Sequence, residues 1–256
     1  MNCIATLKLG LIYCAILLFS SFVVSGENKI KVSVPSFAPF NSFSGMPQCQ
    51  GATVLAVQSI VSKLDVGMEL DNYPYARILH SLKSAKLDIA LIFKNNSIKS
   101  YIDYIGPVSF SKIIVISQPN ITINSYEDLK TVKNIAVIRN AQFDTRFDND
   151  RSLKKINVDS YQQAISMLKH GRVDAVIGSL IGIDYALHQK SMSKTFLSNA
   201  LHLGKKEWGF HLAKNSHYQK LKPQLVKVVA ETFREDLIHQ LYQQQIQQCV
   251  KPAKQH

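Results

Sequence analysis

The chain has 256 residues, enough for two α/β lobes of ordinary size. Its formal net charge is +12 at pH 7, but the lysines are scattered rather than clustered. This pattern indicates a solvated basic surface or a bias towards anionic ligands. Since no nucleic-acid-binding motif is present, we expect no nucleic acid among its partners.

The first 26 residues have the features of a secretory signal peptide. Lys8 is their one charge, residues 9–24 are largely apolar, and the small residues Ser25 and Gly26 precede polar sequence. The apolar run is shorter than the roughly 20 residues that a membrane-spanning helix needs, although an uncleaved anchor is the alternative. We therefore expect cleavage after Ser25 or Gly26 and a mature chain in the periplasm.

The mature chain alternates predicted strands and helices. The first part comprises a strand at 29–37, a loop at 38–51, a helix at 52–64, a strand at 66–72, a helix–strand unit at 75–92 and a buried strand at 112–117. The second part comprises a short helix at 125–129, strands at 134–139 and 155–158 around a polar helix or loop at 141–150, and a second helix–strand unit at 161–179. A return path at 196–203, a strand at 208–213 and a helical pattern at 216–249, which Pro223 breaks or restarts, complete the chain.

The two helix–strand units are similar to each other. In the second, Ser160 has the spacing of a helix cap, Gly171 is placed to stop the helix, and a run of β-branched residues follows. Residues 75–92 match this unit position by position, with Ala85 at the place of Gly171 and Asp88 at the place of Asp174. The repetition predicts two similar α/β lobes, with chance similarity as the alternative.

Three motifs together resemble those of the solute-binding proteins that serve ABC transporters, in the branch that includes polar amino-acid binders. They are PYARILHSLKSAKLDIA at 74–90, YIDYIGPV at 101–108 and LKHGRVDAVIG at 168–178. The resemblance covers most of the chain after residue 28. It implies an α/β fold of two lobes, each with a central, mostly parallel sheet, and a cleft between them. Residues 27–117 and 206–256 would form lobe 1, and residues 118–205 lobe 2.

Ligands of open α/β sheets bind beyond the carboxyl ends of the strands. Asp88, Arg172 and Asp174 lie at amino ends, so we interpret them as structural. The carboxyl ends supply the candidate ligand-binding residues, which are Phe40, Tyr73, Tyr75, Arg77, Phe93, Tyr104, Arg139, Asn140, Phe143 and Ser179.

The candidates differ in the chemistry that they offer. The aromatic residues, with Phe37, would be flat walls for a ligand or plain core. Arg77 would reach an anion or lie on the surface with a packed stem. Arg139 ends a strand before a helix, where a carboxylate meets both the guanidinium and free backbone N–H groups. Ser179 would donate one hydrogen bond or begin a turn.

In amino-acid-binding members of the family, an Arg holds the ligand carboxylate and an Asp holds the ammonium group. The matching positions here are Ile98 and Ser179, so both charged partners are missing. A buried ammonium group without a counter-charge is costly. We therefore predict a small organic anion, or an aromatic or peptide-like acid, rather than an ordinary α-amino acid.

We expect a monomeric binding protein that passes its solute to the permease of an ABC transporter. A ligand-sensing subunit of a membrane receptor would use the same binding chemistry and remains an alternative. An enzyme resembling the periplasmic dehydratases of this fold is a further alternative, but no nucleophile elbow, metal-ligand spacing or phosphate-binding glycine loop is present. We therefore expect no catalytic residue, cofactor or metal.

Two cysteines, Cys49 and Cys249, remain after signal-peptide cleavage. Export places them in an oxidising compartment, and the implied topology places both in lobe 1. We therefore predict a disulfide between them, with two unpaired thiols as the alternative.

Overall fold

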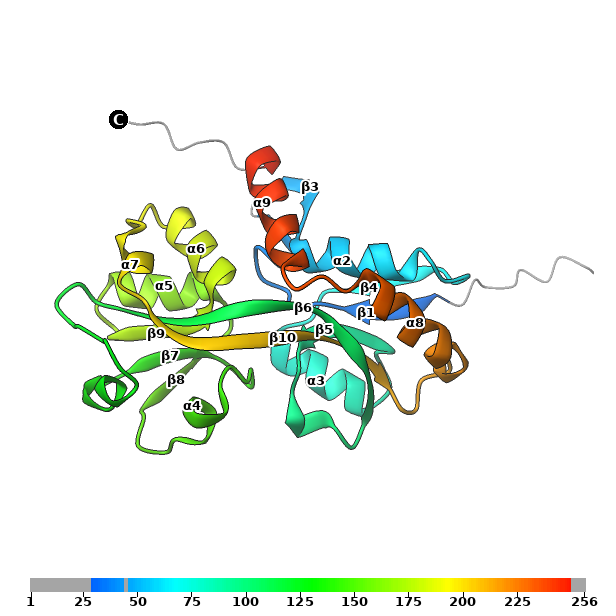
Figure 1. Ribbon diagram of the computed structural model, residues 1–256, viewed down its shortest axis with the longest axis horizontal. Coiled ribbons are helices and arrows are strands. Elements are labelled where there is room, and N and C mark those ends of the chain that lie inside the picture. Colours follow the sequence, from blue (N-terminus) through cyan, green and yellow to red (C-terminus); the bar gives the residue numbers. More distant parts are fainter. Residues whose placement is uncertain (1–28, 44–45, 250–256) are drawn as a thin grey trace, which may run out of the picture.

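The computed structural model describes residues 29–43 and 46–249 (Figure 1). The main sheet contains β1 (Ile30–Ser33), β4 (Met68–Asp71), β5 (Ile89–Phe93), β6 (Ile102–Ser117), β7 (Ile135–Ile138), β8 (Lys155–Val158), β9 (Ala175–Ser179) and β10 (Leu201–Ala213). The helices are α2 (Ala52–Val61), α3 (Tyr75–Lys83), α4 (Thr145–Asn149), α5 (Tyr161–Lys169), α6 (Leu180–Gln189), α7 (Thr195–Ser198), α8 (Lys222–Thr232) and α9 (Leu237–Cys249). The predicted signal peptide lies outside the described residues.

The chain forms two α/β lobes that share two long strands, β6 and β10 (Figure 1). The strand order is β4-β1-β5-β10-β6-β9-β7-β8. In lobe 1, β1 is parallel to β4 and β5, and in lobe 2, β7 is parallel to β8 and β9. This arrangement confirms the predicted two-lobed α/β fold.

Both strands that join the lobes pass from one sheet into the other. Residues 113–117 of β6 pair with β9 in lobe 2, whereas residues 208–212 of β10 pair with β5 in lobe 1. Two extended connections of this kind, here β6 and β10, are typical of lobes that move relative to each other by a hinge. The lobe boundaries at residues 117 and 205 remain a prediction.

Local sequence signals account for the helix–strand unit in each lobe. Ser160 caps α5 by accepting a hydrogen bond from the backbone N–H of Gln163 at 3.1 Å. Gly171 has a φ of 65° and stops the second helix, and Ala85 has a φ of 51° at the matching place. Their apolar faces are buried against the sheet. The two units are therefore the same local structure, as predicted.

Several elements depart from the sequence predictions, including β10, which begins at Leu201 rather than at 208. The expected loop at 38–51 contains a hairpin of β2 (Ser42–Phe43) and β3 (Met46–Gln50). Strand β6 begins ten residues before the predicted strand at 112–117, because its first half pairs with β10 despite Gly106 and Pro107. Helix α6 follows directly on β9, where no element was predicted. Tertiary pairing, rather than local pattern, decides the hairpin and the first half of β6.

A disulfide joins Cys49 on β3 to Cys249 at the end of α9, which confirms the predicted pair. The two residues are 200 positions apart in the sequence. The bond fixes the C-terminal helix to the β2–β3 hairpin, close to α2 in lobe 1 (Figure 1).

Candidate functional site

Aromatic side chains from both lobes meet at the carboxyl ends of the strands. Lobe 1 supplies Phe37, Phe40, Phe93 and Trp208, and lobe 2 supplies Phe143 and Tyr161. We call these six residues the ring cluster. Each side chain is at most 8% exposed. The cluster therefore lies in the interior, between the lobes.

The rings of the cluster are in direct contact across the lobe boundary. Phe37 meets Tyr161 edge to face with centroids 5.5 Å apart, and Phe93 meets Phe143 at 6.0 Å. Within lobe 1, the ring of Trp208 lies 4.2 Å from that of Phe93. These are favourable aromatic geometries, so the rings hold the lobes together and occupy the space between them.

The polar atoms of the cluster are satisfied by the protein. Trp208 donates from Nε1 to Ser111 Oγ at 2.8 Å, and the Tyr161 hydroxyl accepts the backbone N–H of Ser179 at 3.0 Å. Burial raises the pKa of Tyr161 to about 12, so its phenol is neutral at physiological pH. The cluster therefore presents uncharged, flat surfaces.

Hydrogen bonds close the edge of the interface around these rings. Asn95 donates from Nδ2 to the carbonyl of Asn140 at 3.0 Å, and the backbone N–H of Asn96 donates to Gln142 Oε1 at 2.9 Å. Each bond runs from lobe 1 to lobe 2. The structure is therefore a closed arrangement of the lobes, and a solute would reach the cluster only after they separate.

A pocket of about 630 Å³ lies beside this closed edge and is lined by both lobes. Leu79, His80 and Lys83 of α3 line one side, and Asp148 and Lys155 line the other. Burial raises the pKa of the Asp148 carboxyl and lowers that of the Lys155 ammonium group. The pocket offers the space that the ring cluster lacks, together with charges of both signs.

Several predicted residues lie in or against the ring cluster. Phe40, Phe93 and Phe143 belong to it. Tyr75 is buried beside it and donates to the carbonyl of Phe93 at 3.5 Å. Ser179 is fully buried and caps α6 by accepting from the backbone N–H of Gly182, so its hydroxyl is already engaged.

The other predicted residues have partners outside the cluster. The guanidinium of Arg77 is exposed and lies over the ring of Tyr73, 4.6 Å from its centroid. Arg139 is exposed and pairs with Asp159 at 3.2 Å. Tyr104 packs against His211, and its ring receives the ammonium group of Lys94 at 4.2 Å. The structure thus does not bring the two arginines together with the aromatic walls.

Three members of the cluster were not among the ten predicted ligand-binding residues. Phe37 was predicted only as a possible wall or core residue, and Tyr161 and Trp208 were not predicted to face a ligand at all. Tyr161 fits the apolar face of its helix, so periodicity alone assigns it to the core. Trp208 is the single tryptophan of the chain, on the strand predicted to re-enter lobe 1. The signal that identifies Tyr161 is structural, because Gly178 and Gly182 leave room for its ring.

No family model matches the chain. It is similar to ABC transporter arginine-binding protein 1 of Escherichia coli K12, with 25% identity over 175 residues, 66% of this chain and 70% of that protein. The chain is therefore similar in sequence to a solute-binding protein of an ABC transporter.

The chain is also similar to a sensor protein and to a second transport protein. Virulence sensor protein BvgS of Bordetella pertussis is 22% identical over 181 residues, which cover 68% of this chain but 14% of the sensor. The fold is also similar to that of AbpA of Streptococcus pneumoniae, an amino-acid ABC transporter substrate-binding protein, in its structure bound to L-arginine. The TM-score is 0.68 and the sequence identity is 20%. That match covers 88% of this chain and 97% of AbpA. Among residues 29–43 and 46–249, no helix has the length and apolar character to cross a membrane.

Proposed function

We propose that this chain is an extracytoplasmic protein that captures a small organic solute between its lobes and delivers it to the permease of an ABC transporter. The observation that carries the proposal is the ring cluster, to which both lobes contribute and which the hinge strands β6 and β10 would open. Opening would expose flat apolar surfaces on both lobes, and closure around a solute would bury them again.

We propose that the solute has a flat aromatic or apolar face. Ring surfaces favour such a face, and no charged side chain belongs to the cluster. The anionic solute predicted from the sequence has lost its support. Arg77 and Arg139 lie outside the ring cluster, and two of the named relatives, the Escherichia coli protein and AbpA, bind arginine. Ile98 and Ser179 are both buried and uncharged, so we retain the prediction that an α-amino acid is not held through a carboxylate and an ammonium partner.

A thermal-shift screen of the mature protein tests this proposal. The panel contains the twenty standard amino acids, aromatic carboxylates such as benzoate and indole-3-acetate, and uncharged aromatics such as indole and benzamide. A solute at a hundredfold excess over its dissociation constant should stabilise the fold by about 2.7 kcal/mol. We expect aromatic compounds to give the largest shifts. Micromolar binding of arginine or lysine, confirmed by calorimetry, would contradict the proposed solute class while leaving the binding role in place.

A ligand-sensing subunit is a second candidate, favoured by the similarity to the Bordetella sensor. Binding alone does not separate the two roles. Cross-linking of the solute-loaded protein in its native membrane, followed by mass spectrometry, does so: a permease partner supports delivery, and a receptor kinase partner supports sensing.

A further inference from the structure

A second contact joins the lobes, separate from the ring cluster. Tyr242 on α9 donates its hydroxyl to Asp184 Oδ2 on α6 at 2.6 Å. Tyr242 is fully buried, and the Asp184 side chain is 15% exposed. Burial and the Asp184 carboxylate together raise the pKa of Tyr242, so its phenol remains a donor. A hydrogen bond to a charged group in a poorly solvated place is a strong one.

Phe43 of the β2–β3 hairpin completes this contact. Its ring is 2% exposed, meets Tyr185 of α6 edge to face at 5.2 Å, and lies nearly parallel to Tyr242 at 6.3 Å. We call Phe43, Asp184, Tyr185 and Tyr242 the latch. Two of its residues come from the hairpin and α9 of lobe 1, and two from α6 of lobe 2 (Figure 1).

The two segments of lobe 1 that carry latch residues, the β2–β3 hairpin and α9, are covalently joined. The disulfide between Cys49 and Cys249 ties the hairpin that carries Phe43 to the helix that carries Tyr242. Ion pairing adds little to the lobe 2 part, because Lys194 lies 3.9 Å from Asp184 and is 78% exposed. The hydrogen bond from Tyr242 and the ring contacts of Phe43 join the two parts of the latch.

We propose that the latch holds the lobes closed when no solute is bound, and that Tyr242 and Asp184 thereby set how often the solute cleft opens. The latch uses none of the six rings of the cluster, so closure does not depend on a solute filling the cleft. The consequence for binding rests on the proposed function. If solute enters only open molecules, its apparent affinity falls in proportion to the open fraction, and a weaker latch tightens binding.

Hydrogen exchange in the solute-free mature protein tests the latch directly. The backbone N–H of Asn96 bonds to Gln142 Oε1 across the lobes, so its exchange reports lobe opening. Tyr242→Phe removes one hydrogen bond to a carboxylate and should raise the exchange rate of Asn96 about tenfold. The N–H of Arg139, bonded to Val158 within lobe 2, should be unaffected. The emission of Trp208, buried between the lobes, should shift to longer wavelength as a second readout.

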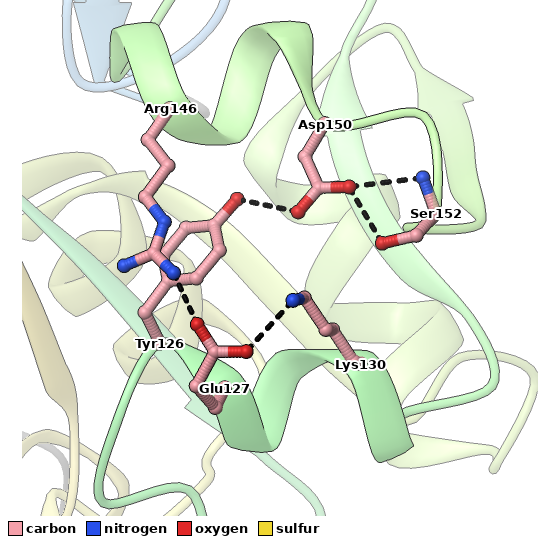
Figure 2. A network of polar contacts seen from close by, with 6 residues as sticks. All are labelled: Tyr126, Glu127, Lys130, Arg146, Asp150 and Ser152. Carbon is pink, nitrogen blue, oxygen red and sulfur yellow. Dashed lines mark hydrogen bonds and ion pairs between the residues drawn. The ribbon is translucent and has the colours of Figure 1, made fainter.

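The chain provides a matched control in a network on the surface of lobe 2. Tyr126 donates its hydroxyl to Asp150 Oδ2 at 3.0 Å, and both residues lie in the same lobe (Figure 2). Tyr126→Phe removes the same kind of hydrogen bond without touching the lobe junction, so Asn96 exchange should remain at the wild-type rate. Asp184→Asn supplies a milder second variant, because its amide still accepts a hydrogen bond but carries no charge.

The outcomes separate clearly. Faster Asn96 exchange in Tyr242→Phe and Asp184→Asn, but not in Tyr126→Phe, supports the latch. Unchanged exchange in both latch variants, or an equal increase in the Tyr126→Phe control, overturns it. Because the experiment contains no solute, its result is independent of the solute screen, and either proposal can fail while the other stands.

Discussion

The two helix–strand units, α3–β5 in lobe 1 and α5–β9 in lobe 2, are built alike but end differently. Each begins with a buried tyrosine whose hydroxyl bonds the last residue of its strand, Tyr75 with Phe93 and Tyr161 with Ser179. In lobe 1 that last residue is a ring that enters the cluster, whereas in lobe 2 it is a serine that caps α6. The repeated positions build the lobes, and the last residue of each strand gives the two sides of the cleft different side chains.

The amino ends of the two strands also match. Asp88 Oδ2 accepts the backbone N–H of Lys31, and Asp174 Oδ2 accepts those of Lys133 and Asn134, each at about 3 Å. Each carboxylate thus fastens a neighbouring strand to its unit, as the structural interpretation of these residues predicted. Their environments differ, because Asp88 is buried with Ser216 and Asp174 is partly exposed.

The largest expected loss of stability comes from crowding the tyrosine ring of the second unit. A Cβ on Gly178 would overlap the Tyr161 ring, which is packed against Phe37 and Phe40 and has no free space to move. Gly178→Ala should lower the free energy of unfolding by about 3 kcal/mol, measured by urea denaturation. Gly106→Ala is the control, since its new Cβ meets one methyl group of Val229 at 3.3 Å and should cost less than about 1 kcal/mol. Equal losses of stability in Gly178→Ala and Gly106→Ala would mean that the Tyr161 ring can move away from the new methyl group.

Removing the matched carboxylates, Asp88 and Asp174, should lower the free energy of unfolding by amounts that differ less. Asp88→Ala leaves the Lys31 N–H and the buried Ser216 hydroxyl without their acceptor and should cost about 2 kcal/mol. Asp174→Ala should cost about 1 kcal/mol, because water reaches the N–H groups that it releases. Chemical denaturation of both variants measures the difference, and a larger loss for Asp174→Ala would contradict the burial argument.

Substitutions at the two helix stops, Gly171 and Ala85, should change the free energy of unfolding least, and in opposite directions. Both residues have left-handed φ values. A Cβ added at Gly171 meets no atom within 4 Å, so only backbone strain is involved. Gly171→Ala should therefore lower the free energy of unfolding by about 1 kcal/mol, and Ala85→Gly should raise it by about 0.5 kcal/mol. Calorimetric melting temperatures check the signs. Two shifts in the same direction would show that the stops are not equivalent.

Local patterns were sufficient to predict the units, because helix periodicity, the Ser160 cap and the Gly171 stop act over a few residues. They were insufficient for the first half of β6, where Gly106 and Pro107 suggest a turn and pairing with β10 overrides them. The disulfide was predictable because export and topology left a single pair of cysteines.

The candidate site was predicted less completely than the fold. The rule of carboxyl ends found Phe40, Phe93 and Phe143, because position after a strand determines which edge a residue occupies. It does not determine side-chain direction, so Arg139, on the same edge, turns outward to Asp159. Tyr161 was assigned to the core because its helix face packs there as well as against the opposite lobe.

The central claim, that solute binds among the rings between the lobes, is tested most directly through Trp208. Its emission is followed while benzamide, an uncharged aromatic, and L-arginine are titrated separately into the mature protein, its Phe37→Ala variant and the Arg146→Ala surface control. The Arg146 side chain is 58% exposed and lies over the ring of Tyr126, within lobe 2 (Figure 2). We predict a saturable change with benzamide. The Phe37→Ala variant should weaken this binding at least tenfold, about 1.4 kcal/mol, and Arg146→Ala should leave it unchanged. Saturable binding that survives Phe37→Ala at full affinity would contradict the account.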